Sequence, residues 1–177
     1  MNEVDMARAL TRIAHEILEH NQGSSNLLIL GIPTGGAHLA KRIAQLISKI
    51  EGVTLEAGTL DVTLHRDDLR MRAPRALMPT YIPPTSSASI KNNGVEGRDV
   101  VLIDDVLFSG RTIRAALDAL GELGRPKTVQ LAVLIDRGHR ELPIRADYVG
   151  KNIPTSHSQS VKVLLSEVDG RDEVALG

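Results

Sequence analysis

The chain has 177 residues with 21 Lys or Arg and 22 Asp or Glu, which gives a formal net charge of −1 at pH 7. This length corresponds to one domain, and 42% hydrophobic with 24% charged residues excludes a disordered, collagen-like or polycationic chain. The absence of Cys excludes disulfides, zinc ribbons and thiol catalysis, while the lack of a long apolar run and of a basic N-terminus predicts a cytoplasmic protein with no membrane span.

The first third of the chain alternates between helical and strand-like patterns. Apolar residues at helical spacing predict a helix from about Val4 to His20, and Thr11 and His15 lie beside its apolar stripe on an accessible face. The continuous apolar run Asn26–Ile32 predicts a strand buried on both faces. The next expected elements are a turn at Pro33–Gly36, a second helix that carries Leu39, Ile43, Leu46, Ile47 and Ile50, and strands at Thr54–Ala57 and Leu60–Leu64.

The stretch from Arg66 to about Gly97 has no hydrophobic period. It contains four prolines, a serine cluster and the tripeptide Asn-Asn-Gly, and its first half is basic. Because it is too long for a connector in a compact domain, it predicts either an active-site lid or a disordered insertion.

Regular patterns return in the second half of the chain. A strand is expected at Asp99–Ile103, a helix from about Thr112 to Leu123 and a buried strand at Thr128–Ile135, followed by two β-like runs, Val161–Val168 and Glu173–Leu176. Alternating strands and helices predict an α/β fold with a mostly parallel twisted sheet flanked by helices. Ligands of such sheets bind outside the carboxyl ends of the strands, which directs attention to the loops after Ile32, Ile103 and Ile135.

The loop after Ile103 carries the strongest chemical signal. Asp104 and Asp105 follow the strand directly, and Ser109-Gly110-Arg111-Thr112 then opens a helix. Glycine, hydroxyl groups and the free N–H groups of a helix N-terminus suit a phosphate, and the two carboxylates suit the hydroxyls of a sugar that carries it. For an isolated acid pair we would favour a cap, with Asp105 ending a turn and Thr112 starting the helix. The spacing to the following Ser-Gly-Arg-Thr favours the phosphate site instead.

A second glycine-containing turn, Thr34-Gly35-Gly36, follows the strand that ends at Ile32. The chain lacks the G-x-G-x-x-G and P-loop patterns, so neither a dinucleotide site nor a P-loop nucleotidase is supported. Two anion sites at the ends of neighbouring strands suggest a sugar phosphorylated at both ends.

Four segments of the chain resemble one known family. The run Val100–Thr112 (VVLIDDVLFSGRT) resembles the phosphoribosyl pyrophosphate motif of type I phosphoribosyltransferases. Together with it, three further segments are similar to the family of bifunctional pyrimidine operon attenuation regulators and uracil phosphoribosyltransferases, namely Ala9–Glu19, Leu60–Leu69 and Ile135–Ser156. The last of these distinguishes the family from the orotate, adenine and hypoxanthine transferases.

This resemblance implies a single phosphoribosyltransferase domain over residues 1–177, with a flexible lid at about 66–97 and a hood at about 136–177. The implied reaction converts uracil and phosphoribosyl pyrophosphate to UMP and pyrophosphate, with Asp104, Asp105 and Arg137 as catalytic residues. The acids would hold the ribose, the loop Ser109–Thr112 the 5′-phosphate, and Thr34 and Gly35 the pyrophosphate. The implied substrate-binding set is completed by Val106, Leu107, Phe108, Gly110, Arg111, Arg137 and Val161.

The expected metal is Mg²⁺ held mainly by phosphoribosyl pyrophosphate and water, because Mg²⁺ keeps several waters and prefers substrate oxygens. We expect no protein-only metal site, and the six histidines show no metal-ligand spacing. One departure concerns Gly35, where relatives usually carry Arg. Loss of that cation predicts weaker affinity for phosphoribosyl pyrophosphate with activity retained.

The resemblance also implies regulation of pyrimidine genes by binding to leader mRNA, promoted by UMP or UTP. Positions that match the RNA face of the family are Thr11, His15, Arg140, Arg145 and Lys151. Net charge and scarce aromatic residues alone do not indicate RNA, and these charges could equally form a solvated face. The alternative is a regulator that binds RNA and senses uridine nucleotides with weak catalysis, and a third possibility is a transferase for a purine or for orotate. Members of this family form dimers and often tetramers, so a homodimer or higher homo-oligomer is expected.

Overall fold

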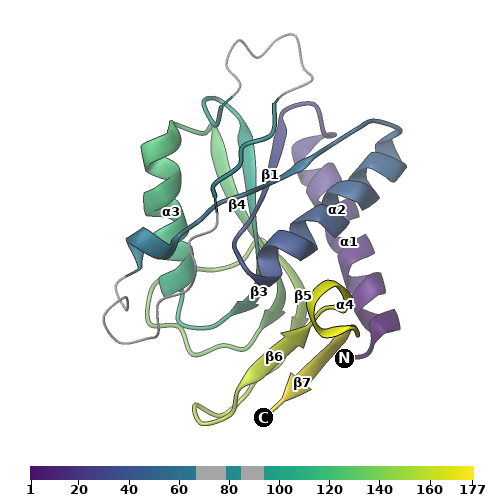
Figure 1. Ribbon diagram of the computed structural model, residues 1–177, viewed down its shortest axis with the longest axis vertical. Helices are drawn as coiled ribbons and strands as arrows, with labels where there is room; N and C mark the ends of the chain where they lie inside the picture. The colour runs from purple at the N-terminus through teal and green to yellow at the C-terminus, as the bar shows by residue number, and fades with distance from the viewer. Residues whose placement is uncertain (67–78, 85–93) are drawn as a thin grey trace.

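A five-stranded parallel sheet forms the centre of the computed structural model, which describes residues 1–66, 79–84 and 94–177. Its strand order is β2-β1-β3-β4-β5, so that β3 lies in the middle and pairs with both β1 and β4. Figure 1 shows the strands running toward a small C-terminal hairpin. The strands of the main sheet are β1 (Leu27–Gly31), β2 (Ala57–Thr59), β3 (Asp99–Leu107), β4 (Thr128–Asp136) and β5 (Tyr148–Asn152).

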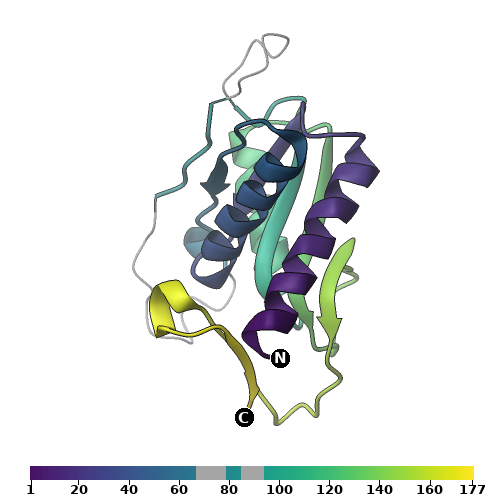
Figure 2. The same cartoon turned by 90° about the vertical axis from the view of Figure 1, so that its right-hand side faces the viewer.

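Three helices cover the two faces of this sheet. Helices α1 (Glu3–Asn21) and α2 (Gly35–Glu51) pack side by side on one face, and α3 (Arg111–Leu123) covers the other, as Figures 1 and 2 show from two sides. Alternate residues of β3 serve the two faces: Val101 packs under α1 and α2, whereas Val100 packs under α3. The strands are therefore buried on both faces, as their continuous apolar runs predicted.

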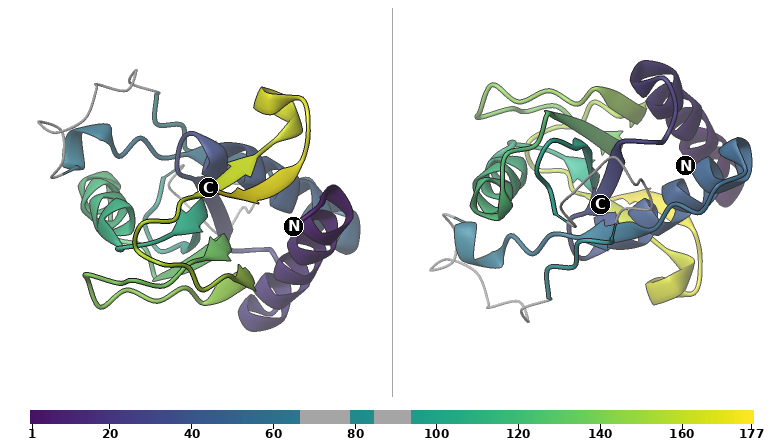
Figure 3. Two further views of the ribbon diagram at one scale, coloured as in Figure 1. Left: turned by 90° about the horizontal axis from the view of Figure 1, so that it is seen from below. Right: turned by 90° about the horizontal axis from the view of Figure 1, so that it is seen from above.

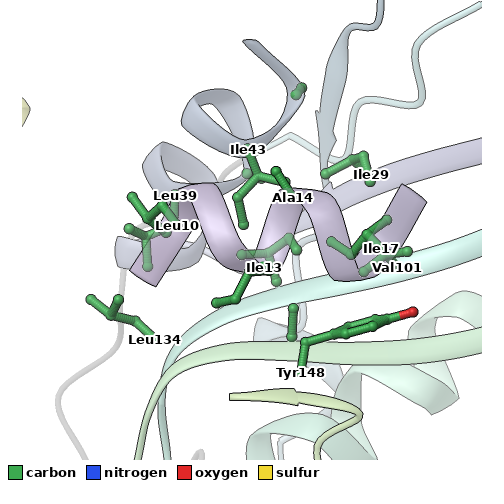
Figure 4. Packing of buried hydrophobic residues seen from close by; sticks show 14 of the residues in the cluster. Leu10, Ile13, Ala14, Ile17, Ile29, Leu39, Ile43, Val101, Leu134 and Tyr148 are labelled. Atoms are coloured by element: carbon green, nitrogen blue, oxygen red, sulfur yellow. The ribbon is translucent and has the colours of Figure 1, made fainter. Parts of the chain in front are cut away.

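The apolar stripe of α1 lies against α2 and the sheet, as Figure 4 shows. Ile13 and Ile17 point toward the sheet, where Tyr148 closes the layer beside Val101. The Tyr148 hydroxyl donates to Gln130 Oε1 at 2.6 Å, so its polar end is satisfied inside the core. In the part of the chain described, no helix has both the length and the apolar character needed to cross a membrane.

The C-terminal hairpin consists of antiparallel strands β6 (Val161–Leu164) and β7 (Glu173–Leu176), joined through the short helix α4 (Ser166–Asp169). The view from below in Figure 3 places it next to both chain termini. Arg42 of α2 holds it by ion pairs with Glu167 and Asp172, and the Met1 amino group donates to Val174 O. The hairpin lies within the stretch expected to form a hood, whereas β5 of the same stretch extends the main sheet.

Two of the predicted strands are absent or shorter than expected. In both places a side-chain hydrogen bond to the backbone ends the extended conformation. The expected strand Leu60–Leu64 is absent, and a 3₁₀ turn (η1, Thr63–His65) stands there instead. Asp61 Oδ1 accepts from the Thr63 N–H and hydroxyl, a local turn that competes with sheet pairing. The expected strand Val161–Val168 ends at Leu164, because Asp169 Oδ2 accepts from the Leu165 N–H and α4 follows.

Other differences concern boundaries. The short strand expected at Thr54–Ala57 lies later, at Ala57–Thr59. Strand β3 extends to Leu107 instead of ending at Ile103, so the two acids lie within the strand and not in a loop. Strand β5 was not predicted, because its sequence Tyr148–Asn152 carries a glycine and two polar residues.

Candidate active site

A pocket of about 600 Å³ opens at the carboxyl edge of the sheet. It lies where β1, β3 and β4 end, since their parallel pairing aligns those ends. Its wall is formed by the turn after β1, the end of β3 with the loop that follows, the loop after β4, and the C-terminal hairpin. The lining residues are Pro33, Thr34, Gly35, Arg66, Asp104 through Ile113, Arg137, Glu141 and Val161.

Two adjacent carboxylates stand at the centre of this pocket. Asp104 is 7% exposed, its Oδ1 accepts from the Asp105 N–H at 3.0 Å, and Asp105 Oδ1 accepts from the Val106 N–H at 2.8 Å. Burial, with the neighbouring charge of Asp105 added to it, raises the pKa of the Asp104 carboxyl well above its usual value. The pair is therefore suited to a ligand that supplies hydroxyl donors or positive charge.

The segment Ser109–Thr112, here called the phosphate loop, leads from β3 into α3. Gly110 has φ 93° and is the N-cap of α3, so the N-cap residue itself has no side chain to bond the helix end, and Ser109 Oγ accepts from the Arg111 N–H at 3.5 Å. The interpretation of Thr112 as the cap is therefore wrong, and no bond from the N-cap residue occupies the N–H groups in the first turn of α3. Arg66 Nη1 lies 3.4 Å from Thr112 Oγ1, which brings a further cation to this loop.

The turn after β1 approaches the carboxylates closely. A Cβ atom at Gly36 would lie 2.3 Å from Ile103 O, and one at Gly35 would lie 2.4 Å from Asp105 Oδ2. A side chain at Gly36 would therefore clash with the backbone, whereas one at Gly35 would displace the Asp105 side chain, and neither glycine has a positive φ. The peptide bond between Pro33 and Thr34 is cis. Since α2 begins at Gly35, its N-terminus also faces the pocket.

Arg137, in the loop after β4, is held rigidly at the wall of the pocket. Its guanidinium lies 4.2 Å from the centre of the Phe108 ring, and it donates to Thr155 Oγ1 and Ser156 O, both at 3.1 Å. The side chain is buried, so its orientation is set before any ligand enters. Beside it, Glu141 accepts from Arg111 Nε at 2.7 Å.

The structure brings all the predicted substrate-binding residues to this one pocket. It adds Pro33, Arg66, Ile113 and Glu141, which sequence reasoning did not assign to the site. In the sequence Arg66 stands out only as the start of a basic stretch, and nothing there pairs Glu141 with Arg111. Most of the lid expected at about 66–97 lies outside the described residues.

The predicted RNA-binding residues divide into separate places. Thr11 and His15 are exposed on α1, in a second hollow of about 770 Å³ that Arg8 and Arg12 also line. Arg12 donates to Val149 O and Gly150 O, which joins this helix face to the strand that carries exposed Lys151. Arg145 is exposed, whereas Arg140 is half-buried against the pocket wall. Within residues 1–66, 79–84 and 94–177, no group of three metal-ligating side chains could hold a metal ion.

A family model for phosphoribosyl transferase domains matches residues 2–166. Among solved structures, hypoxanthine phosphoribosyltransferase from Trypanosoma cruzi in complex with IMP has a TM-score of 0.64 at 18% identity, over 88% of this chain and 76% of the other. A purine phosphoribosyltransferase from Pyrococcus horikoshii has a TM-score of 0.61 at 18% identity, over 86% of each chain. At this identity the likeness establishes the fold alone.

The chain therefore belongs to the phosphoribosyl transferase domain family, and its predicted α/β fold is confirmed. Bifunctional protein PyrR of Streptomyces coelicolor is 61% identical over 98% of this chain and 86% of its own length. The protein of the same name from Clostridioides difficile is 50% identical over 99% of this chain and 95% of its own length. Within the phosphoribosyl transferases, the chain belongs to the family of bifunctional protein PyrR.

The raised pKa of Asp104 predicts that this carboxylate lowers stability at neutral pH. When the pKa of a carboxyl is higher in the folded than in the unfolded state, the folded protein loses stability as the pH rises through the folded pKa. Asp104→Asn cannot ionise and can still accept from the Asp105 N–H. We expect its melting temperature to exceed that of the wild type by a few degrees at pH 8, with little difference near pH 4.

Differential scanning calorimetry at both pH values measures this effect, with Asp118→Asn on the exposed face of α3 as the matched control. The control should melt like the wild type at both values. A variant less stable than the wild type at pH 8, or equally stabilised at both pH values, would contradict the assignment.

The close contact of Gly35 predicts that even one methyl group displaces Asp105. The three atoms nearest to a Cβ at Gly35 all belong to the Asp105 side chain, with Oδ2 at 2.4 Å, Cγ at 2.9 Å and Cβ at 3.0 Å, so Gly35→Ala should shift that whole side chain and leave the rest of the fold intact. Displacement of the Asp105 carboxylate from the pocket should lower kcat/KM for phosphoribosyl pyrophosphate by roughly 10-fold, the loss typical of one hydrogen bond. Steady-state kinetics measures this, with Gly121→Ala on α3 as the control, since no atom lies within 4 Å of a Cβ there. Equal kinetics in the two variants would contradict the prediction.

Proposed function

We propose that this protein is a uracil phosphoribosyltransferase, which joins N1 of uracil to C1 of the ribose of phosphoribosyl pyrophosphate and releases pyrophosphate. The observation that carries the proposal is the meeting, in one pocket, of two carboxylates, a helix N-terminal phosphate loop and a second glycine-containing turn. Family membership confirms the phosphoribosyltransferase class that the sequence predicted.

Each wall of the pocket suits one part of the donor. The phosphate loop Ser109–Thr112 offers N–H and hydroxyl donors to the 5′-phosphate, and Thr34 with Gly35 lies at the N-terminus of α2 for the pyrophosphate. Asp104 and Asp105 lie between these two anion sites and accept from the ribose 2′- and 3′-hydroxyls. Such hydroxyl donors, with the cation Arg66 nearby, favour the ionised acids that burial disfavours.

Breaking the bond from C1 to pyrophosphate develops oxocarbenium-like positive charge on the ribose, as at other glycosidic centres. Asp104 and Asp105 supply negative charge close to that ring, while Thr34 and the α2 N-terminus stabilise the leaving group. The carboxylate oxygens of the acid pair fit Mg²⁺, which when bound with water and substrate oxygens would neutralise pyrophosphate charge. The segment after Arg66 is proposed as the lid that excludes water.

Arg137 is proposed to orient the base. Its guanidinium is already fixed by Phe108, Thr155 and Ser156, so it can present one of its other N–H groups to a pyrimidine carbonyl with little further loss of side-chain entropy. Val161 of the C-terminal hairpin supplies an apolar surface beside it. A small pyrimidine such as uracil is the base proposed to bind between these two side chains.

The second proposed function is regulation of pyrimidine genes through leader RNA, promoted by UMP or UTP. Thr11, His15, Arg145 and Lys151 are exposed, and Arg12 joins α1 to the strand of Lys151, so two of the predicted regions adjoin. The alternative, a uridine-nucleotide sensor with weak catalysis, is favoured by Gly35, which brings no cation to the pyrophosphate turn. A cytoplasmic homodimer or higher homo-oligomer is the proposed form.

The first test is formation of UMP from uracil and phosphoribosyl pyrophosphate with Mg²⁺, with orotate, hypoxanthine and adenine assayed in parallel. We expect turnover of uracil alone. The double variant Asp104→Asn/Asp105→Asn should lose at least about 100-fold of this rate, since charge opposite the developing cation is removed. Turnover of a purine or of orotate would contradict the proposed substrate. UMP binding without any turnover would favour the regulator with weak catalysis.

RNA binding should depend on salt, because Lys and Arg release counterions from phosphates. With UMP present, the double variant Arg145→Gln/Lys151→Gln should bind a pyrimidine leader stem-loop more weakly and with a salt slope reduced by roughly 1 to 2. Filter binding at several salt concentrations measures both quantities. Arg125→Gln, an exposed arginine in the connection between α3 and β4, is the matched control. An unchanged slope in the double variant would exclude this face from the RNA interface.

A further inference from the structure

Three successive carbonyl groups at the end of β3 are bonded to the loop that follows β4. Leu107 O accepts from the Arg137 N–H at 3.1 Å, and Ser109 O accepts from the N–H groups of Glu141 and Leu142 at 3.0 and 3.2 Å. Between them, Phe108 O accepts from the side chain of Arg140, whose Nη1 lies 2.8 Å away. Arg140 thus takes the place of a backbone donor in a ladder that continues beyond the sheet.

Most N–H groups of the Arg140 guanidinium donate hydrogen bonds to acceptors within the protein. Nε donates to Ile144 O at 3.0 Å, Nη1 donates also to Gly138 O at 3.1 Å, and Nη2 donates to Asp136 Oδ2. With the bond to Phe108 O, four of its five N–H groups have internal acceptors. A planar guanidinium can meet four such acceptors, whereas the point-like ammonium of lysine cannot.

The bond to Phe108 O fixes the orientation of one peptide group of the active site. In a trans peptide the C=O and the following N–H point in opposite directions. Because Phe108 O is turned toward Arg140, the N–H of Ser109 is turned away from the loop after β4, and both residues line the pocket. The side of the peptide opposite Arg140 therefore presents a donor at the start of the phosphate loop.

We propose that Arg140 is a positioning residue for the 5′-phosphate site, which acts by holding the Phe108–Ser109 peptide with its N–H toward the ligand. This inference rests on the proposed function, since it takes a ribose 5-phosphate as the ligand of that loop. It assigns to Arg140 a role different from direct contact with RNA phosphates. The same side chain then couples the nucleotide site to the loop that leads to exposed Arg145.

Two substitutions separate positioning from charge. Arg140→Met keeps an unbranched apolar side chain and removes the charge and every donor, whereas Arg140→Lys keeps the charge and loses the planar fork. If Arg140 acts through the peptide, both variants should bind UMP about 10- to 100-fold more weakly, the effect of one hydrogen bond to a charged group. Uridine, which has no phosphate, should bind both variants within about 3-fold of the wild type. The KM for phosphoribosyl pyrophosphate should rise in the same way, with the KM for uracil unchanged.

Isothermal titration with UMP and with uridine, in the absence of RNA, measures the ratio of the two affinities. Arg114→Gln, an exposed arginine of α3 that does not line the pocket, is the matched control for loss of charge near the loop. If Arg140→Met does not fold, the ratio measured for Arg140→Lys decides. A wild-type ratio in a folded variant, with RNA binding alone lost, would overturn the inference and leave the proposed function standing. Failure of the wild type to bind UMP would instead overturn the proposed function itself.

Discussion

The site depends on the parallel pairing of β3 with β1 on one side and β4 on the other. Gly31 pairs with Ile103, and Leu107 pairs with Asp136, so that the ends of these strands meet at one edge of the sheet. Because β3 continues past the end of β1, it carries Asp104 and Asp105 to the level of the turn that starts α2. Gly35 and Gly36 then permit this turn to pack directly against the acids.

At this edge of the sheet, the proposed role of the acid pair in binding a ligand conflicts with the stability of the folded protein. Two carboxylates at the end of a buried strand repel one another, and burial raises the pKa of Asp104. The apolar layers on both sides of the sheet compensate for this cost, with Ile29, Val101 and Leu134 under α1 and α2 and Val100, Leu102 and Val133 under α3. Hydroxyl donors or cations brought close to these two carboxylates would offset their repulsion.

Side chains of arginine connect the parts that the sheet does not reach. Arg42 holds the C-terminal hairpin to α2, Arg12 holds α1 to β5, and Arg140 holds the loop after β4 to the end of β3. Each makes several bonds from one planar group, which suits arginine better than lysine. The hairpin, α1 and the loop after β4, none of which belongs to the main sheet, are thereby fixed to the elements next to them.

The sequence by itself determined the α/β class, the two glycine-containing turns and the acid pair, because hydrophobic period, glycine and adjacent acids are local signals. It also indicated the family through the run Val100–Thr112. Local signals failed at Leu60–Leu64, where the Asp61 side chain makes a turn, and at β5, whose mixed sequence becomes a strand only by pairing with β4. Only the tertiary structure decided that Arg66 and Glu141 line the pocket and that Arg140 bonds to Phe108, because these contacts join residues far apart in the chain.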